Sequence, residues 1–279
     1  MLDPSSPVID PQPRTLAAAD AAVVRSAVRP AYSEVSARKR LGLIVLSSDL
    51  TTEPDYARLL PRDQVACYTT RVQSQNPTTP ENLLKMLPRL RAAAALFPED
   101  HAPAAICYSC TAASVLMGDE AVTQAIQEAW PGVPVVTPSH SAALALRALG
   151  ARRISILTPY LPETSVPVTA YFTQQGFTVL RSECLGIEDD RLMARVTPDS
   201  IFAAACALDH PDSDAVFISC TALPAVQVID RVEQQLGKPV VTSNQATLWA
   251  MLRQAGITAQ PQGYGQLFNN RAGENSDEK

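Results

Sequence analysis

A repeated tetrapeptide holds the residues best suited to chemistry. The sequence Ser-Cys-Thr-Ala occurs at residues 109–112 and again at residues 219–222. Cys110 and Cys220 each follow a short apolar run and precede a segment with helical spacing, so each is expected at a strand end beside a helix N-terminus. The positive end of a helix dipole favours a thiolate, so we expect a lowered pKa at both thiols. Two thiols on opposite sides of a substrate could remove and deliver a proton, or one could add covalently and later leave.

Other interpretations of the cysteines depend on packing or on metal chemistry. Free cysteine is often buried as a small apolar residue, but the repeated context argues against that for Cys110 and Cys220. Residues 107–110 form one CxxC, a possible redox or zinc motif, yet no second CxxC occurs and the three histidines lack ligand spacing. We therefore expect no metal site. The cysteines at positions 67, 107, 184 and 206 are assigned to packing.

Eight short apolar runs predict the strands that position these cysteines. They lie at residues 41–46, 65–68, 104–107, 133–136, 154–157, 178–180, 215–218 and 239–241. Longer segments with helical spacing separate them. This alternation of strand and helix predicts an α/β fold with parallel sheets.

Further paired motifs indicate that the chain contains an internal repeat. Gly132-Val-Pro-Val-Val-Thr137 recurs as Gly237-Lys-Pro-Val-Val-Thr242, and Thr79-Pro-Glu81 recurs as Thr197-Pro-Asp199. In the second pair, threonine is expected to cap a helix and proline to occupy its first position. The similar spacing of the pairs predicts two Rossmann-like lobes, residues 40–150 and 151–268, related by a pseudo-two-fold. The active site is expected in the cleft between the lobes.

The two ends of the chain differ from this repeat. Residues 1–39 are rich in proline and lack sustained periodicity, which indicates a flexible arm. A short helix around Ala17–Val28 could dock on a partner subunit, so a homo-oligomer is expected. The segment 269–279 is a polar tail.

Charge and composition exclude several classes of function. The chain has 23 Lys+Arg against 28 Asp+Glu, a net charge of −5, and only 5% aromatic residues. Nucleic-acid and membrane-surface binders need a basic field, and base-stacking platforms need aromatic side chains. No segment reaches the ~20 apolar residues of a membrane span, and the N-terminus does not resemble a secretion signal. Neither a GxGxxG nor a GxSxG motif occurs. We expect a soluble, cytoplasmic protein that acts on a small molecule.

Several motifs together carry a resemblance to a known family. Besides the two Ser-Cys-Thr motifs, they are Gly-Leu-Ile-Val-Leu-Ser-Ser at 42–48, Leu-Thr-Pro-Tyr at 157–160, Leu-Gly-Ile at 185–187, Pro-Val-Val-Thr-Ser-Asn-Gln at 239–245 and Gly-Tyr-Gly-Gln-Leu-Phe at 263–268. Over about residues 40–268 the chain resembles the aspartate/glutamate racemase superfamily, in the branch of maleate cis–trans isomerases and arylmalonate decarboxylases. The runs 76–82, 106–111 and 158–164 most closely resemble the ectoine-utilisation A proteins.

The resemblance implies an enzyme that needs neither cofactor nor metal and that uses both cysteines. Decarboxylases of this branch keep only the second-lobe cysteine, so the presence of Cys110 and Cys220 favours isomerisation or racemisation of a small carboxylate. The candidate substrate-binding residues are Ser48, Asp49, Thr111, Tyr160, Asp190, Thr221 and Asn244. The two threonines are expected to hold a carboxylate and the tyrosine to donate its hydroxyl. Asn244 could instead only cap its helix.

Two of these residues depart from the pattern of maleate isomerases. Those enzymes carry asparagines where this chain has Asp49 and, on the best alignment, Asp190. Two ionised acids would repel a dicarboxylate but would suit an ammonium or a donor N–H, unless both acids point to water. We therefore expect a racemase or isomerase of an amino carboxylate, such as an acetyl-diaminobutyrate from ectoine degradation.

Alternative functions remain open from the sequence. The chain could be a maleate isomerase, an enzyme like arylmalonate decarboxylase, or a non-catalytic protein that binds a small molecule. His140 begins a helix of the first lobe and could line the cleft, although a structural role is favoured.

Overall fold

The computed structural model describes residues 25–33, 38–259 and 261–269. The chain divides into two units, residues 1–36 and 37–279. In the first unit, residues 25–33 form neither helix nor strand, and the rest of the helix expected around Ala17–Val28 lies outside the described residues. Everything below concerns the second unit.

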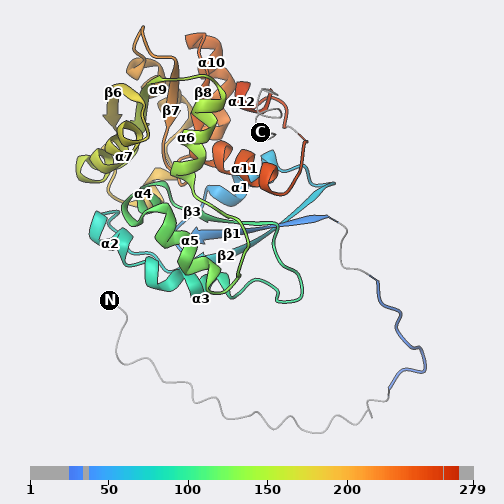
Figure 1. The fold of residues 1–279 in the computed structure, drawn as a ribbon. Helices are drawn as coiled ribbons and strands as arrows, with labels where there is room; N and C mark the ends of the chain where they lie inside the picture. The colour runs from blue at the N-terminus through green and yellow to red at the C-terminus, as the bar shows by residue number, and fades with distance from the viewer. Residues whose placement is uncertain (1–24, 34–37, 260, 270–279) are drawn as a thin grey trace, which may run out of the picture. The chain divides into compact units, whose positions relative to one another are not determined.

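Two sheets of four parallel strands form the framework of this unit (Figure 1). The first contains β1 (Lys39–Leu46), β2 (Val65–Val72), β3 (Ala105–Ser109) and β4 (Val135–Val136), in the order β2-β1-β3-β4. The second contains β5 (Arg153–Thr158), β6 (Thr178–Cys184), β7 (Ala215–Ile218) and β8 (Val240–Thr242), in the order β6-β5-β7-β8. The strand order of one sheet repeats in the other, which confirms the predicted α/β fold with parallel sheets. Every predicted strand overlaps an observed one.

Helices connect successive strands in both halves. The first half contains α1 (Thr52–Leu59), α2 (Pro80–Leu84), the 3₁₀ helix η1 (Leu87–Arg89), α3 (Leu90–Ala94), α4 (Thr111–Met117), α5 (Asp119–Gln127) and α6 (Pro138–Ala148). The second contains α7 (Pro162–Gln174), α8 (Asp190–Met193), α9 (Pro198–Leu208), the 3₁₀ helix η2 (Ala225–Val228), α10 (Ile229–Leu236), α11 (Ser243–Gln254) and α12 (Gln266–Asn269). Among the described residues, no helix is long and apolar enough to cross a membrane.

Threonine caps set the starts of several helices, as the sequence predicts. The Thr79 hydroxyl accepts a hydrogen bond from the Asn82 N–H at the start of α2, and Thr197 does the same for Ser200 at the start of α9. Thr242 forms a capping box with Gln245 at the start of α11. Each cap satisfies N–H groups that have no partner within the helix. These caps fix where the helices begin relative to the strand ends.

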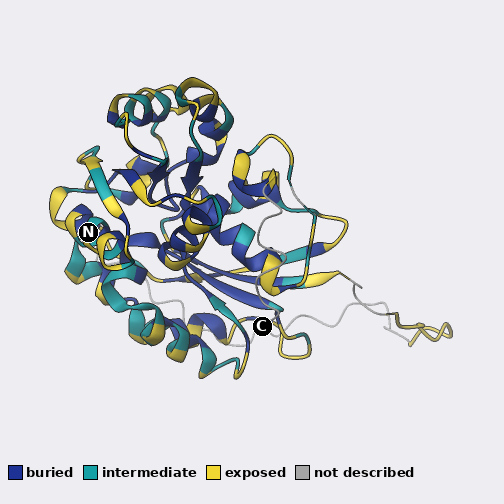
Figure 2. Cartoon of the chain, turned by 45° about the horizontal axis from the view of Figure 1, so that its top comes forward, coloured by how far each residue is buried: buried dark blue, intermediate teal, exposed yellow. Residues whose placement is uncertain are grey.

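The core lies on both faces of the two sheets. Strands β3 and β7 are wholly buried, as parallel strands covered by helices on both faces should be. In Figure 2 the buried residues gather on the strands and on the inner helix faces, and the exposed residues lie on loops and outer helix faces.

Two helices join the halves of the unit. Helix α6 follows the first sheet yet contacts β8 of the second, and α11 follows the second sheet yet contacts β3 of the first. The two helices also pack against each other (Figure 1). This exchange brings the carboxyl ends of β3 and β7, and the cysteines that follow them, into one region.

Candidate active site

The two repeated cysteines lie at equivalent strand ends. Cys110 follows β3 and is the N-cap residue of α4, and Cys220 lies two residues beyond β7. Their residues are 7% and 5% exposed. The thiols are close enough for the charge of Cys110 to raise the pKa of Cys220. The structure therefore brings together the two residues on which the predicted chemistry depends.

The backbone at Cys220 differs from that at Cys110. Among the described residues, Cys220 is the only residue other than glycine with a positive φ, at 100°. Its N–H donates to Ser243 Oγ at 3.0 Å, and its Sγ accepts from the Ala222 N–H at 3.3 Å. An irregular segment follows Cys220, and η2 begins only at Ala225. The expectation that both cysteines directly precede a helix is therefore wrong for Cys220. A positive φ costs about 1–3 kcal/mol at such a residue, so surrounding contacts must hold it.

Both thiols have a raised pKa, contrary to the expected lowering. The pKa of Cys110 is raised to about 12, mainly by burial and in smaller part by the charges of Asp190 and Asp49. Burial also raises the pKa of Cys220 well above its usual range, with Asp190 as the next cause. A backbone N–H of Ala113 favours the Cys110 thiolate, as expected at a helix N-terminus, but desolvation outweighs it. Both cysteines are thus thiols at neutral pH before substrate binds.

Tyr160 lies beside both thiols. Its residue is 2% exposed, and the charges of Cys220 and Cys110 both raise the pKa of its phenol. Hydrogen bonding from Tyr160 lowers the pKa of Cys220. The structure therefore places a neutral hydroxyl next to both thiols, and its role as a donor to a substrate stays a prediction.

Asp190 is buried near the thiols and retains an acceptor. It begins α8, is 6% exposed, and accepts a hydrogen bond from the Ser48 hydroxyl at 2.7 Å through Oδ2. Among the described residues, its other oxygen accepts no hydrogen bond. Burial raises the pKa of Asp190 to about 6. Ser48 therefore acts on this site by orienting Asp190.

Asp49 is also buried, but its oxygens are occupied. Its Oδ1 accepts from the N–H groups of Thr51 and Thr52 at 2.8 Å, and its Oδ2 accepts from the Thr52 hydroxyl at 2.5 Å. These bonds cap the start of α1. With Asp49 at 3% and Asp190 at 6% exposure, the alternative that both acids point to water is wrong. Of the two acids, only Asp190 has an oxygen that accepts no hydrogen bond from the described residues.

The threonines after the two cysteines join the halves of the site. The Thr111 hydroxyl donates to Ser243 Oγ at 2.8 Å, and the Thr221 hydroxyl donates to the Ser109 carbonyl at 3.1 Å. Each threonine thus reaches the strand end or helix start of the other half. In this structure their hydroxyl hydrogens are used within the protein, and their part in holding a substrate carboxylate stays a prediction.

Asn244 does not cap its helix, because Thr242 does. The Asn244 Nδ2 donates to Asp55 Oδ2 and to the Thr221 carbonyl, each at 2.9 Å. It is 2% exposed and supports the loop that carries Cys220. Asp55 and Ser243 belong to this network, although the sequence does not predict them as site residues. Ser243 adjoins the repeated Pro-Val-Val-Thr motif, which is the signal that could have indicated it.

The side chain of His140 lies at the start of α6 and is 52% exposed. Its Nδ1 lies 3.9 Å from Asp119 Oδ2. This position agrees with a structural role. Cys107 is fully buried on β3, as its assignment to packing requires.

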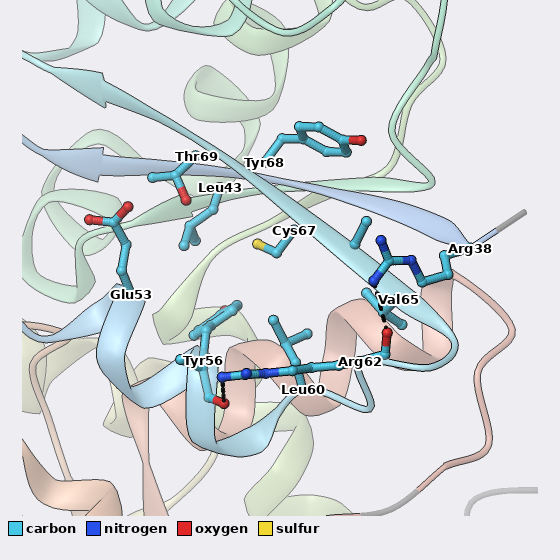
Figure 3. Close-up of a pocket in the computed structure, with 12 residues that line it drawn as sticks. Arg38, Leu43, Glu53, Tyr56, Leu60, Arg62, Val65, Cys67, Tyr68 and Thr69 are labelled. Atoms are coloured by element: carbon cyan, nitrogen blue, oxygen red, sulfur yellow. Dashed lines mark hydrogen bonds between the residues drawn. The ribbon is translucent and has the colours of Figure 1, made fainter. Parts of the chain in front are cut away.

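A surface pocket of about 450 Å³ lies between α1 and β2 (Figure 3). Side chains from both elements point into it, among them Tyr56, Glu53 and Cys67. Neither Cys110 nor Cys220 lines this pocket. It is therefore separate from the candidate active site.

Comparisons with known proteins identify relatives that match most of the second unit. The profile of the arylmalonate decarboxylase family matches residues 41–268. The chain is 30% identical to a maleate isomerase of Nocardia farcinica, over 82% of this chain and 95% of that protein. The crystal structure of the maleate isomerase Iso from Pseudomonas putida superposes with a TM-score of 0.77, at 26% identity, over 84% of this chain and 99% of that one. A further similar structure, with a TM-score of 0.75 and 26% identity, is a mutant of the Nocardia farcinica maleate cis-trans isomerase with a covalently bound succinylcysteine intermediate; the match covers 82% of this chain and 98% of that one.

Proposed function

The chain belongs to the arylmalonate decarboxylase family as a maleate isomerase-like cysteine enzyme, and from this premise we propose that it isomerises a small amino carboxylate with Cys110 and Cys220. One observation carries the choice of substrate. The charged groups that most affect both thiols are acids, with Asp190 acting on each. A substrate ammonium or N–H would complement this acid, whereas a second carboxylate would be repelled.

The same electrostatics supports activation of the thiols by the substrate. Asp190 raises the pKa of both Cys110 and Cys220. An ammonium bound beside Asp190 neutralises that effect and favours a thiolate, while a dicarboxylate opposes it. Binding of the correct substrate then promotes the reactive form of the enzyme.

The proposed reaction is racemisation by two bases. One thiolate removes the α-proton and becomes a thiol, and the opposite thiol gives its proton to the other face of the same carbon. The intermediate enolate needs donors that hold its negative charge, and the Tyr160 hydroxyl lies beside both thiols for this role. An acetylated diaminobutyrate fits these requirements, and the resemblance to the ectoine-utilisation A proteins supports it.

Maleate isomerisation is the second candidate, because the relatives named above are maleate isomerases. One thiolate would add to the double bond, the central carbon–carbon bond would rotate, and elimination would regenerate the thiolate. The pKa of Asp190 near 6 favours this candidate at lower pH, where a neutral Asp190 would donate a hydrogen bond to a substrate carboxylate.

A parallel assay in deuterated water tests the two candidates. Maleate and each enantiomer of acetyl-diaminobutyrate are incubated separately with the enzyme and followed by NMR. The proposal predicts deuterium at the α-carbon of the amino substrate and little fumarate. Rapid fumarate formation without deuterium incorporation into the amino substrate would replace the proposal with maleate isomerisation.

A further inference from the structure

A buried acid–amide pair lies behind the loop that carries Cys220. Asp55 belongs to α1 and is 1% exposed, and Asn244 belongs to α11 and is 2% exposed. The Asn244 Nδ2 donates to Asp55 Oδ2 and to the carbonyl oxygen of Thr221, each at 2.9 Å. The pair therefore joins the first helix of the unit directly to the residue that follows Cys220.

One oxygen of each group in this pair has no hydrogen-bond donor. Among the described residues, Asp55 Oδ1 and Asn244 Oδ1 are both buried without a hydrogen-bond partner. The orientation of the amide is fixed, because both neighbours of its Nδ2 are acceptors. A buried acceptor that lacks a donor is costly, and here two such oxygens belong to the same two contacting groups. A single proton would satisfy both.

We propose that Asp55 is protonated in the native protein below neutral pH and that the neutral acid and the Asn244 carboxamide form a pair with two hydrogen bonds, which positions the Cys220 loop. In this pair the amide Nδ2 donates to Asp55 Oδ2, and the Asp55 Oδ1 hydroxyl donates to Asn244 Oδ1. The proton comes from solvent when the chain folds and returns to solvent when the acid ionises. Asp55 touches neither thiol in this arrangement and acts as a positioning residue.

The surroundings of Asp55 set the pH at which it ionises. Burial favours the neutral acid, and so does the charge of Asp49, whereas Asn244 and the guanidinium of Arg58 favour the carboxylate. The Arg58 Nη1 lies 3.7 Å from Asp55 Oδ1. Because the Arg58 side chain is 44% exposed, solvent weakens its attraction for the Asp55 carboxylate. The balance raises the pKa of Asp55 to about 7. From α11 and the Cys220 loop, the groups that face Asp55 are the uncharged amide of Asn244 and, through it, the Thr221 carbonyl.

The pair matters for Cys220 because that residue has a strained backbone. Side-chain hydrogen bonds hold the peptide groups after it. Asn244 donates to the Thr221 carbonyl at 2.9 Å, the Thr51 hydroxyl donates to the Ala222 carbonyl at 2.7 Å, and the Thr52 hydroxyl makes a longer contact of 3.4 Å with the Thr221 carbonyl. Ionisation of Asp55 removes the donor from Asn244 Oδ1 and leaves a buried charge behind the loop. Loss of the pair should therefore release the loop and expose the Cys220 thiol.

Carbon-13 NMR of labelled aspartate carboxyl groups tests the protonation of Asp55 directly. The proposal predicts one aspartate that titrates near pH 7 in the wild-type protein and is missing in Asp55→Asn. The control Asp63→Asn, at an exposed position, should leave that signal unchanged. Titration of the Asp55 signal near its ordinary value of 3.8 would overturn the proposal.

The rate at which iodoacetamide modifies Cys220, measured by peptide mass spectrometry, tests the positioning role. Asp55→Asn introduces an amide that can make the same two hydrogen bonds at every pH, so Cys220 should stay as protected as in the wild type at pH 6. Asn244→Leu removes the donor to Thr221 while keeping a similar side-chain volume, so modification should become about tenfold faster. Equal protection in Asn244→Leu and the wild type, or loss of protection in Asp55→Asn, would overturn the proposal. The proposal rests on the proposed function only in treating Cys220 as a reacting thiol. Neither measurement uses turnover, so failure of the isomerase assays would not affect the outcome.

Discussion

The hydroxyl of Thr221, the residue after Cys220, donates to the carbonyl oxygen of Ser109, the residue before Cys110, at 3.1 Å. The backbone segments that carry the two thiols are therefore joined across the halves of the unit. Thr111 makes the reciprocal contact with Ser243, which also accepts from the Cys220 N–H. The separation of the thiols is thus set by contacts between the halves and not by either sheet alone.

Thr221→Val removes the contact with Ser109 while keeping the shape of the side chain. We expect a stability loss of about 1–2 kcal/mol, because the Ser109 carbonyl loses a buried donor. Turnover should fall more than KM changes, because the displaced thiols still allow the substrate to bind. Thr178→Val, at an exposed strand position, is the matched control and should change neither quantity. Steady-state kinetics and denaturant unfolding measure both effects, and unchanged turnover in Thr221→Val would show that the contact does not position the thiols.

Asp190→Asn should change substrate preference, because one oxygen of Asp190 accepts no hydrogen bond from the described residues and is proposed to accept from the substrate. A charge-assisted hydrogen bond of about 1.5–3 kcal/mol corresponds to a loss of roughly 10- to 100-fold in kcat/KM for the amino substrate. The same change should improve tolerance of maleate by removing a negative charge. Asp63→Asn, at an exposed position, is the paired control and should leave the preference unchanged. An unchanged preference ratio in Asp190→Asn would contradict recognition of an ammonium or N–H by this acid.

Asp55 should make stability depend on pH between about 4 and 7. Its pKa is about 7 in the folded chain and near 3.8 when unfolded, so the native state holds the proton more tightly. The Asp55 proton contributes on the order of 4 kcal/mol to the free energy of unfolding. This contribution is fully present below about pH 4 and is lost as the pH rises through 7. Asp55→Asn lacks this dependence, so its stability relative to the wild type should rise from pH 4 to 7 and then level off. Urea unfolding across this range measures the difference, and a constant difference would contradict the shifted pKa.

His140→Ala should leave catalysis nearly unchanged. The side chain is 52% exposed, and its ionic contact with Asp119 Oδ2 is long, at 3.9 Å. Its contribution to stability is therefore expected to be below about 1 kcal/mol. A loss in kcat/KM of more than about tenfold, equivalent to 1.4 kcal/mol, would assign His140 a part in the reaction.

The sequence predicts the framework of the second unit well because its signals are local. Apolar runs, threonine caps and the internal repeat identify all eight described strands and the starts of α2 and α9. They also place Cys110 and Cys220 at equivalent strand ends. The domain limits, the homo-oligomer and the role of the N-terminal arm stay predictions.

The details of the site depend on contacts between distant residues, which local patterns do not contain. The pairing of Thr111 with Ser243 spans 132 residues, and that of Asn244 with Asp55 spans 189. The sequence predicts the direction of the thiol pKa shifts wrongly, because a strand–helix junction indicates a dipole but not the extent of burial. The occupied oxygens of Asp49 likewise follow from the conformation of the turn before α1, and its sequence alone did not reveal them.

The most direct test of the account is α-deuterium exchange by Cys110→Ser and Cys220→Ser, each with the separate enantiomers of acetyl-diaminobutyrate. Thermal unfolding near that of the wild type serves as the control for folding. Two bases on opposite faces predict that neither variant racemises, that each still exchanges the α-proton of only one enantiomer, and that the preferred enantiomer differs between the variants. Full racemisation by both variants, or exchange of the same enantiomer by both, would contradict the two-cysteine mechanism.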